Sequence, residues 1–315
     1  MQLQTKIPIQ EQSPKINYNS SLVLLGSCFV ENIGKKFDYF KLKNTLNPFG
    51  ITFHPLVLER LIKSSLKDKS YSEDDVFQLN ERWHCYDAHS VLSDASQSKL
   101  INNLNLASKT LKRSLTNASH IVVTLGTAWG YVQQQSTEVV NNCHKVPQKN
   151  FKKTLASVDE LVVSLKSISA TIKAINPEAK LILTVSPVRH IKDGFVENTQ
   201  SKAHLISAVH KTISATNNTA YFPSYEIMMD ELRDYRFYSE DMLHPSQIAV
   251  NYIWDQFIAA WFSQEGKDTL NRVNDIQRGL AHRPFNPSSD AHQKFIKNLQ
   301  EKIEALQKDY PQIKF

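Results

Sequence analysis

The sequence is poor in cysteine and glycine, with only three cysteines and eight glycines among its 315 residues. Cys28, Cys85 and Cys143 are odd in number and widely spaced, so no disulfide framework is predicted. The glycines form neither a dinucleotide-binding fingerprint nor a phosphate-binding loop, and the histidine and cysteine spacings match no zinc pattern. We therefore expect no cofactor and no metal.

Long hydrophobic runs and concentrated charge are also lacking. The first residues have no continuous apolar stretch of the signal-peptide kind, and no segment reaches the length of a membrane-spanning helix. We therefore expect a cytoplasmic protein with reduced thiols and no membrane contact. The 37 basic and 31 acidic residues give a net charge of +6 without a basic cluster, so no nucleic-acid partner is predicted. The oligomeric state is not indicated.

Short apolar strands alternate with helical patterns along much of the chain. Expected strands cover residues 22–25, 121–125, 181–185 and 219–222, and expected helices cover about 30–40, 155–175 and 201–212, with another after Pro245. Strands that are apolar on both faces and joined by helices predict a mostly parallel sheet covered on both sides. The fold class is therefore a three-layer α/β/α arrangement.

The domain organisation follows from changes in this pattern. Residues 1–265 are expected to form one α/β domain, with a less orderly polar stretch at about 55–118 that is interpreted as an insertion or a cap over the site. Residues 266–315 are helical in pattern and rich in Lys and Glu, with an apolar stripe. They are expected to form a helical C-terminal extension packed on the main body.

Two distant segments carry residues suited to covalent acyl transfer. Ser27 and Cys28 follow the first strand, and Asp241 and His244 stand three residues apart before the last long helix of the main domain. A nucleophile, a base and a carboxylate that orients the base are what this chemistry requires. A helix amino terminus stabilises an anion, so the position of Cys28 predicts a lowered thiol pKa.

Structural roles remain open for each of these residues. Ser27 suits a helix N-cap, and a free cysteine such as Cys28 is often a small buried hydrophobe. His244 could cap the helix after Pro245, and Asp241 alone is typical of a turn. Adjacent side chains at a strand end point in different directions, so we expect only one of Ser27 and Cys28 to reach His244.

Other strand ends also carry polar or aromatic side chains, at the edge where open α/β sheets bind ligands. Thr127 and Trp129 follow the second strand, and Arg189 and His190 follow the third. Arg189 suits an oxyanion or an anionic substrate group, or equally a structural salt bridge. Trp129 suits sugar stacking or a place in the core.

Several ordered blocks between about residue 20 and about residue 290 resemble the GSCFA family. The blocks are Gly26–Val30, Asn47–Gly50, Thr124–Trp129, Ser186–His190, Tyr221–Glu226, Arg233–Tyr238 and Asp241–Pro245. That family is similar to the SGNH or GDSL hydrolases, which are esterases and O-acyltransferases on a flavodoxin-like sheet. The resemblance therefore implies an ester-processing enzyme on that fold.

The resemblance also implies roles for individual residues. Register with the superfamily's Gly-Asp-Ser places Cys28 at the nucleophile position, and Asp241 and His244 match its late Asp-x-x-His. Gly50 corresponds to an oxyanion glycine, whereas the usual Gly-x-Asn is replaced by Gly126-Thr127-Ala128 and its Asn donor is absent. The residues expected to bind the oxyanion or substrate are Asn47, Gly50, Gly126, Thr127, Trp129, Arg189 and His190.

The predicted function is an acyl-ester hydrolase or O-acyltransferase that acts on a small or carbohydrate-like substrate. The alternative is a non-catalytic descendant of the same fold that binds a glycan or metabolite, which the missing Asn donor favours. A third possibility is a scaffold that uses the basic helical tail for protein contacts.

Overall fold

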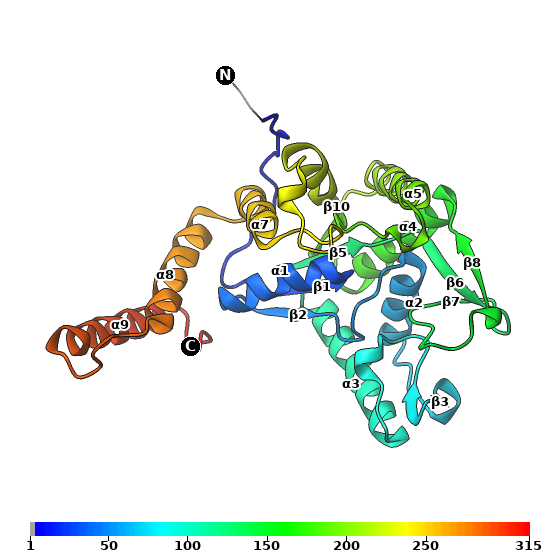
Figure 1. The fold of residues 1–315 in the computed structure, drawn as a ribbon, viewed down its shortest axis with the longest axis horizontal. Helices are drawn as coiled ribbons and strands as arrows, with labels where there is room; N and C mark the ends of the chain where they lie inside the picture. Colours follow the sequence, from blue (N-terminus) through cyan, green and yellow to red (C-terminus); the bar gives the residue numbers. More distant parts are fainter. Residues whose placement is uncertain (1–3) are drawn as a thin grey trace.

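The centre of the molecule is a five-stranded parallel sheet (Figure 1), seen in a computed structural model that describes residues 4–315. Its strands are β1 (Leu22–Gly26), β2 (Asn44–Leu46), β5 (His120–Leu125), β9 (Lys180–Val185) and β10 (Thr219–Tyr221), and their spatial order is β10-β9-β5-β1-β2. Counted along the chain, these strands have the flavodoxin-like order 2-1-3-4-5. The predicted parallel α/β sheet is confirmed, although the short β2 was not foreseen.

One face of the sheet is covered by α1 (Cys28–Tyr39) and α7 (Gln247–Trp261). Successive strand residues point to opposite faces, so Leu22 and Leu24 of β1 pack in the cluster that these two helices share. The helix expected at about 30–40 begins earlier, at Cys28. This shift places the cysteine in the first turn of α1.

The other face is covered by four helices, which bury Val23 and Leu25 of β1. They are α2 (Pro55–Leu66), α3 (Gln97–Thr116), α4 (Val158–Ile175) and α5 (Phe195–Ile213). The stretch 55–118 therefore supplies two helices, α2 and α3, to the layer over the sheet. Between them lies the hairpin β3 (Phe77–Leu79) and β4 (Arg82–His84).

A second, antiparallel sheet of order β7-β6-β8 follows β5 along the chain. It consists of β6 (Trp129–Gln133), β7 (Val139–Val140) and β8 (Phe151–Leu155). The short helical elements are α6 (Ser224–Glu226), a π-helical turn at Ile227–Glu231, and 3₁₀ turns at Glu73–Asp75, Ser90–Leu92, Gln148–Asn150, Ile191–Asp193 and Tyr235–Phe237. Neither this sheet nor the π-helical turn was predicted from the sequence.

The C-terminal region is helical, as expected, and consists of α8 (Gln264–Ala281) and α9 (Asp290–Asp309). Figure 1 shows both helices at the end of the molecule away from β6–β8. Leu306 of α9 is fully buried, and the rings of Tyr18 and Tyr310 lie 5.3 Å apart. The C-terminal region therefore packs in the same hydrophobic cluster as Leu22 and Leu24 of β1. Within residues 4–315, the structure has no helix with the length and apolarity needed to cross a membrane.

Candidate active site

The candidate site lies where the strand order reverses, between β1 and β5. Connections from these neighbouring strands leave toward opposite faces, which opens a crevice at their carboxyl ends. The chain leaves β1 at Gly26, whose φ of +132° is unfavourable for any other residue. A Cβ there would lie 2.1 Å from the carbonyl oxygen of Thr124. Gly26 therefore permits the close turn that brings Cys28 to the crevice.

Asn47 holds this turn in place. Its Oδ1 accepts the Gly26 N–H at 2.8 Å, and its Nδ2 donates to the Gly26 carbonyl oxygen at 3.3 Å. One buried side chain thus bonds both backbone polar groups of Gly26, whose carbonyl oxygen also accepts the Thr52 N–H at 2.9 Å. Asn47, predicted to bind the oxyanion or substrate, has its amide engaged by the turn before the nucleophile candidate.

Ser27 and Cys28 point to different surroundings. Ser27 occupies the N-cap of α1, but its side chain makes no capping hydrogen bond. Its side chain is fully buried, and its Oγ has no hydrogen-bond partner among the described residues. Cys28 is partly exposed, and its Sγ lies 3.6 Å from Nε2 of His244. Only Cys28 is therefore placed to exchange a proton with the imidazole.

Asp241 fixes the orientation and tautomer of His244. The carboxylate Oδ2 lies 2.6 Å from Nδ1, and Oδ1 accepts the backbone N–H groups of Leu243 and His244. A carboxylate is only an acceptor, so Nδ1 carries the proton and Nε2 presents its lone pair to Cys28. Asp241 and His244 thus form a hydrogen-bonded pair that faces the Cys28 turn.

Arg189 anchors the loop that carries this pair. Its backbone N–H donates to the Leu243 carbonyl oxygen and its Nη1 donates to that of Met242, each at 3.1 Å. Met242 has a φ of +57°, so the loop turns tightly between the acid and the base. The observed role of Arg189 is therefore support of the loop, and no contact places it at an oxyanion.

The pKa values of the Asp241 carboxyl and the Cys28 thiol are shifted in opposite directions. The amides of His244 and Leu243 lower the pKa of Asp241 to about 2, with a further contribution from the imidazole. Burial raises the pKa of the Cys28 thiol, although the Lys202 charge and the amides of Cys28 and Phe29 oppose this rise. The lowered thiol pKa expected from the helix terminus is therefore wrong, because desolvation outweighs the favourable dipoles. His244 Nε2, at 3.6 Å from Sγ, is placed to accept the thiol proton.

Three backbone N–H groups at or next to the expected oxyanion positions are already engaged. The Gly50 N–H donates to the Asn47 carbonyl oxygen at 2.7 Å, and a Cβ at Gly50 would meet His89 at 2.5 Å. The N–H of Ala128, at the position where the resemblance led us to expect an Asn donor, donates to Ser201 Oγ at 2.7 Å. The Gly126 N–H donates to the Phe53 carbonyl oxygen at 3.0 Å. None of these backbone groups is free to meet an oxyanion in this arrangement.

Thr127 and Trp129 form structural contacts with α5. Thr127 Oγ1 lies 3.0 Å from Ser201 Oγ and accepts the Trp129 N–H. The indole N–H of Trp129 donates to the Glu197 carbonyl oxygen, and Lys153 lies over the ring at 4.9 Å from its centroid. A sugar could therefore stack on the occupied face of Trp129 only by displacing Lys153.

His190 lies beside the base and is held neutral. Its Nε2 is buried without a hydrogen-bond partner among the described residues. Burial lowers the pKa of His190 to about 3, and the charges of Lys202 and His244 lower it further. Its ring meets Phe53 edge to face at 5.6 Å. His190 is therefore an available neutral hydrogen-bonding group next to the site.

Lys202 was missed by the sequence analysis. It lies on α5, is 1% exposed, and its Nζ donates to the carbonyl oxygens of Gly126 and Ser186, both at 2.7 Å. Burial lowers its pKa to about 7. The sequence carries no clear signal of this burial, because the buried stripe of α5 also contains the polar residues Asn198 and Ser201.

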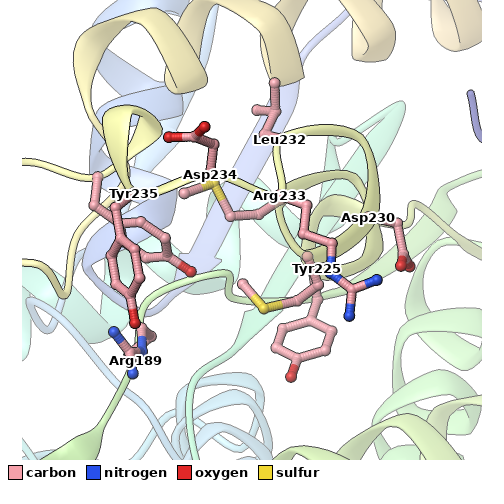
Figure 2. Close-up of a pocket in the computed structure, with 10 residues that line it drawn as sticks. Arg189, Tyr225, Asp230, Leu232, Arg233, Asp234 and Tyr235 are labelled. Atoms are coloured by element: carbon pink, nitrogen blue, oxygen red, sulfur yellow. The ribbon is translucent and has the colours of Figure 1, made fainter. Parts of the chain in front are cut away.

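Two cavities adjoin the loop after β9, and neither is lined by Cys28 or His244 themselves. One cavity, of about 430 Å³, is lined by Arg189 and by residues between Tyr225 and Tyr238. Figure 2 shows Arg189 and Tyr235 on one side of this cavity, and Tyr225, Arg233 and Asp230 on the other. The other, of about 360 Å³, is lined by His190 together with aromatic and amide side chains. Arg189 and His190 thus each line one of the two cavities.

Metal ligands are not gathered in the part of the chain that the structure describes. The rings of His84 and His144 lie 4.7 Å apart, but residues 4–315 contain no group of three or more His, Cys, Asp or Glu side chains placed to hold an ion. Both rings instead bond to neighbours: His84 to Ser93 Oγ and His144 to the Cys85 carbonyl oxygen.

Comparison with known proteins identifies the family. No curated protein matches the sequence. The GSCFA family matches residues 21–257, a span that contains Cys28, Asp241 and His244. The C-terminal domain of GSCFA domain proteins matches residues 273–315, which cover the second half of α8 and all of α9. Since the first match extends over most of its length, the chain belongs to the GSCFA family.

Proposed function

We propose that this protein is an acyl-ester hydrolase or O-acyltransferase related to the SGNH hydrolases, with Cys28 as its nucleophile. The observation that carries the proposal is the continuous array of Cys28 Sγ, the His244 ring and the Asp241 carboxylate, joined at 3.6 and 2.6 Å. It lies at the switch point of a 2-1-3-4-5 sheet, where such folds bind ligands. The order of nucleophile, acid and base along the chain is also that of the SGNH enzymes.

The array supports a two-step acyl transfer. His244 Nε2 takes the thiol proton as Cys28 Sγ attacks the ester carbonyl carbon, and the resulting imidazolium gives that proton to the departing alkoxide oxygen. This leaves an acyl thioester on Cys28 and a free alcohol. Water or an acceptor hydroxyl then attacks the thioester and loses its proton to His244. Asp241 stabilises the imidazolium throughout, and the returning proton restores the thiol.

The first turn of α1 supplies the best candidates for oxyanion donors. The backbone N–H groups of Cys28 and Phe29 already favour the negative charge on Sγ, and helix amino termini attract anions. Losing one well-placed oxyanion donor costs about 2.7–4 kcal/mol of transition-state stabilisation in enzymes of this kind. These amides therefore take the place of the missing Asn and of the engaged Gly50.

The cavity of about 360 Å³ fits a small or carbohydrate-like substrate. Its lining includes Phe53, Tyr131, Asn141, Asn142 and His190. Pockets of this size with apolar walls and a few amides suit small hydroxylated ligands. The three thiols are free, which supports the accompanying proposal of a reducing, cytoplasmic location.

Labelling and turnover together test the proposal. Iodoacetamide labelling with peptide mapping is expected to modify Cys28 faster than Cys85, whose pKa burial raises to about 12, and Cys143, whose pKa burial raises to about 11. The two other thiols serve as internal controls. His244→Ala should slow labelling of Cys28, and both Cys28→Ala and His244→Ala should abolish hydrolysis of p-nitrophenyl acetate. A folded wild type without either reaction would overturn the enzymatic reading.

A binding protein of the same fold is the second candidate. It is favoured by one observation, that Ala128 and Gly50 provide no free donors at the usual oxyanion positions. In that case small glycans or metabolites would bind the cavity and Cys28 would label no faster than Cys143. The labelling experiment therefore separates the two functions.

A further inference from the structure

Lys202 ties together the carboxyl ends of two strands beneath the nucleophile turn. Its Nζ donates to Gly126, directly after β5, and to Ser186, directly after β9, each at 2.7 Å. Gly126 in turn approaches Ser27, since a Cβ at Gly126 would lie 3.3 Å from the Ser27 Cβ. The ammonium therefore lies under the turn that presents Cys28.

A buried lysine is a costly way to satisfy two carbonyl oxygens. Removing an ammonium from water is strongly unfavourable unless an anion compensates it. No carboxylate pairs with Lys202 within 4.0 Å among residues 4–315. A neutral hydroxyl or amide donor could bond a carbonyl at lower cost, so the tie alone does not explain the choice of lysine.

The groups that face Lys202 leave one candidate for a counter-ion. Cys28 of α1 interacts with the charge of Lys202. The ring centroid of Tyr225 in α6 lies 5.9 Å from Nζ. In the loop after β9, the charge of Lys202 lowers the pKa of His190. His190 can only be neutral or positive. Burial raises the pKa of Tyr225 above its usual value, so the phenol stays neutral near pH 7. Cys28, whose thiol would lose its proton in the proposed reaction, is the remaining group that can become an anion beside Lys202.

We propose that Lys202 is a positioning residue that holds the ends of β5 and β9 together and serves as the internal counter-ion of the Cys28 thiolate. The inference deepens the proposed acyl transfer and rests on it for its catalytic meaning. The charge of Lys202 would favour the thiolate that attacks the ester and the thiolate that leaves from the thioester. His244 remains the proton acceptor.

The two ionisations are then coupled. Burial lowers the pKa of Lys202 and raises that of Cys28, whereas each charged form favours the other. Linkage requires the effect to be reciprocal, so the thiolate raises the pKa of the amine by as much as the ammonium lowers that of the thiol. The negative charge of Glu31 in α1 raises the pKa of the Cys28 thiol, and His244 lies directly beside the thiol. Both groups therefore also influence the pH at which Cys28 ionises.

The first experiment measures the pH dependence of Cys28 alkylation by iodoacetamide, followed on the Cys28 peptide by mass spectrometry. In Lys202→Met the midpoint should rise by about one pH unit or more, which means about tenfold slower alkylation below the midpoint. Lys202→Arg keeps the charge and should restore most of the wild-type profile. Lys180→Met is the control, because Lys180 is a half-buried lysine that begins β9 at the opposite end of the sheet.

A second measurement covers the case in which Lys202→Met does not fold. NMR titration of ¹³C-labelled lysine should show one amine with a depressed pKa in the wild type, absent from Lys202→Arg. By reciprocity that pKa should fall further in Cys28→Ala, which removes the thiolate. Identical titration of this amine in wild type and Cys28→Ala, or an unchanged Cys28 profile in folded Lys202→Met, would overturn the inference.

Neither readout needs a substrate. If ester turnover is absent but the ionisations of Lys202 and Cys28 are coupled, the proposed function is wrong and the pairing of Lys202 with the Cys28 thiolate is supported. If turnover depends on Cys28 but the two titrations are independent, the function stands and Lys202 is only a structural tie.

Discussion

Ser27 and Cys28 are adjacent in the chain, yet only Cys28 reaches His244. Cys28 Sγ lies 3.6 Å from Nε2, whereas Ser27 Oγ is buried without a hydrogen-bond partner in the described structure. Because Cys28 is the first residue of α1, its side chain leaves the turn toward the crevice as that of Ser27 turns inward. The sequence did not decide between these two nucleophile candidates, and the geometry favours Cys28.

Ser27→Ala is expected to leave both folding and turnover intact. The hydroxyl makes no capping bond, so the usual cost of losing a cap, about 1 kcal/mol, does not apply. Removing an unsatisfied buried hydroxyl should leave the free energy of unfolding unchanged or raise it by about 1 kcal/mol. Urea denaturation monitored by circular dichroism measures this, with Ser157→Ala as control, since Ser157 does cap α4. A folded but inactive Ser27→Ala would instead assign the chemistry to Ser27.

The main elements of the fold were predictable because their signals are local. Apolar runs bounded by glycine or proline marked β1, β5 and β9, and 3.6-residue periodicity marked α4. The three-residue β2 and the β7-β6-β8 sheet were missed because short, half-exposed strands carry little periodic signal. Their pairing depends on contacts distant in sequence.

The site was only partly predictable, for a similar reason. The Asp241–His244 pair lies within one turn of chain, so its spacing was informative. The role of Asn47 as a brace and the burial of Lys202 depend on how separate elements meet in space. The thiol pKa was predicted in the wrong direction because the helix dipole is visible in sequence, whereas desolvation of Cys28 is not.

Asn47→Ala should destabilise the protein and loosen the nucleophile turn. It removes the Asn47 partner of the buried Gly26 N–H and leaves the Gly26 carbonyl oxygen with the Thr52 N–H alone, and one unsatisfied buried group costs about 1–3 kcal/mol. We expect the free energy of unfolding to fall by about 2–3 kcal/mol and alkylation of Cys28 to lose its selectivity. Asn44→Ala is the control, because Asn44 bonds to Asp38 at the surface and should cost under about 1 kcal/mol.

An Asn47→Ala protein as stable as the control, with unchanged Cys28 labelling, would contradict the bracing role. The comparison is informative because both side chains belong to the same short stretch of chain and both are replaced by alanine.

His54 should make stability depend on pH between its unfolded and folded pKa values. Burial lowers its pKa from 6.5 to about 4. The unfolded state therefore binds more protons in this range, so stability is full above pH 6.5 and is lost as pH falls toward 4. Its share approaches about 3 kcal/mol at the acid end. His144 and His190, with pKa values lowered to about 4 and about 3, add to the same trend.

The measurement compares urea denaturation of wild type and His54→Asn at pH 7 and pH 4.5. His54 Nδ1 accepts the Leu56 N–H at the start of α2, a capping role that Asn also fills. His54→Asn should therefore flatten the pH dependence, while loss of the Nε2 bond to the Ala128 carbonyl oxygen costs about 1–3 kcal/mol at pH 7. His210→Asn, at an exposed position on α5, should keep the wild-type slope. Equal slopes in wild type and His54→Asn would refute the prediction.

Asp241→Asn should abolish most turnover while preserving the loop. Asp241 Oδ1 accepts two backbone N–H groups, and the oxygen of Asn can keep both. Only the carboxylate facing His244 Nδ1 is lost, which frees the ring to adopt the other tautomer and turn an N–H toward Cys28. Turnover of an ester should fall by about 10²–10⁴-fold. Since the pKa of Asp241 is about 2, the wild-type carboxylate stays ionised at pH 4. A loss of activity in acid above that pH must therefore come from another group.

Asp234→Asn is the matched control, because Asp234 is also exposed, accepts the backbone N–H of Arg236 and lies outside the array. Full activity in Asp241→Asn, with the same melting temperature as Asp234→Asn, would show that His244 needs no orienting carboxylate and that the array is not catalytic.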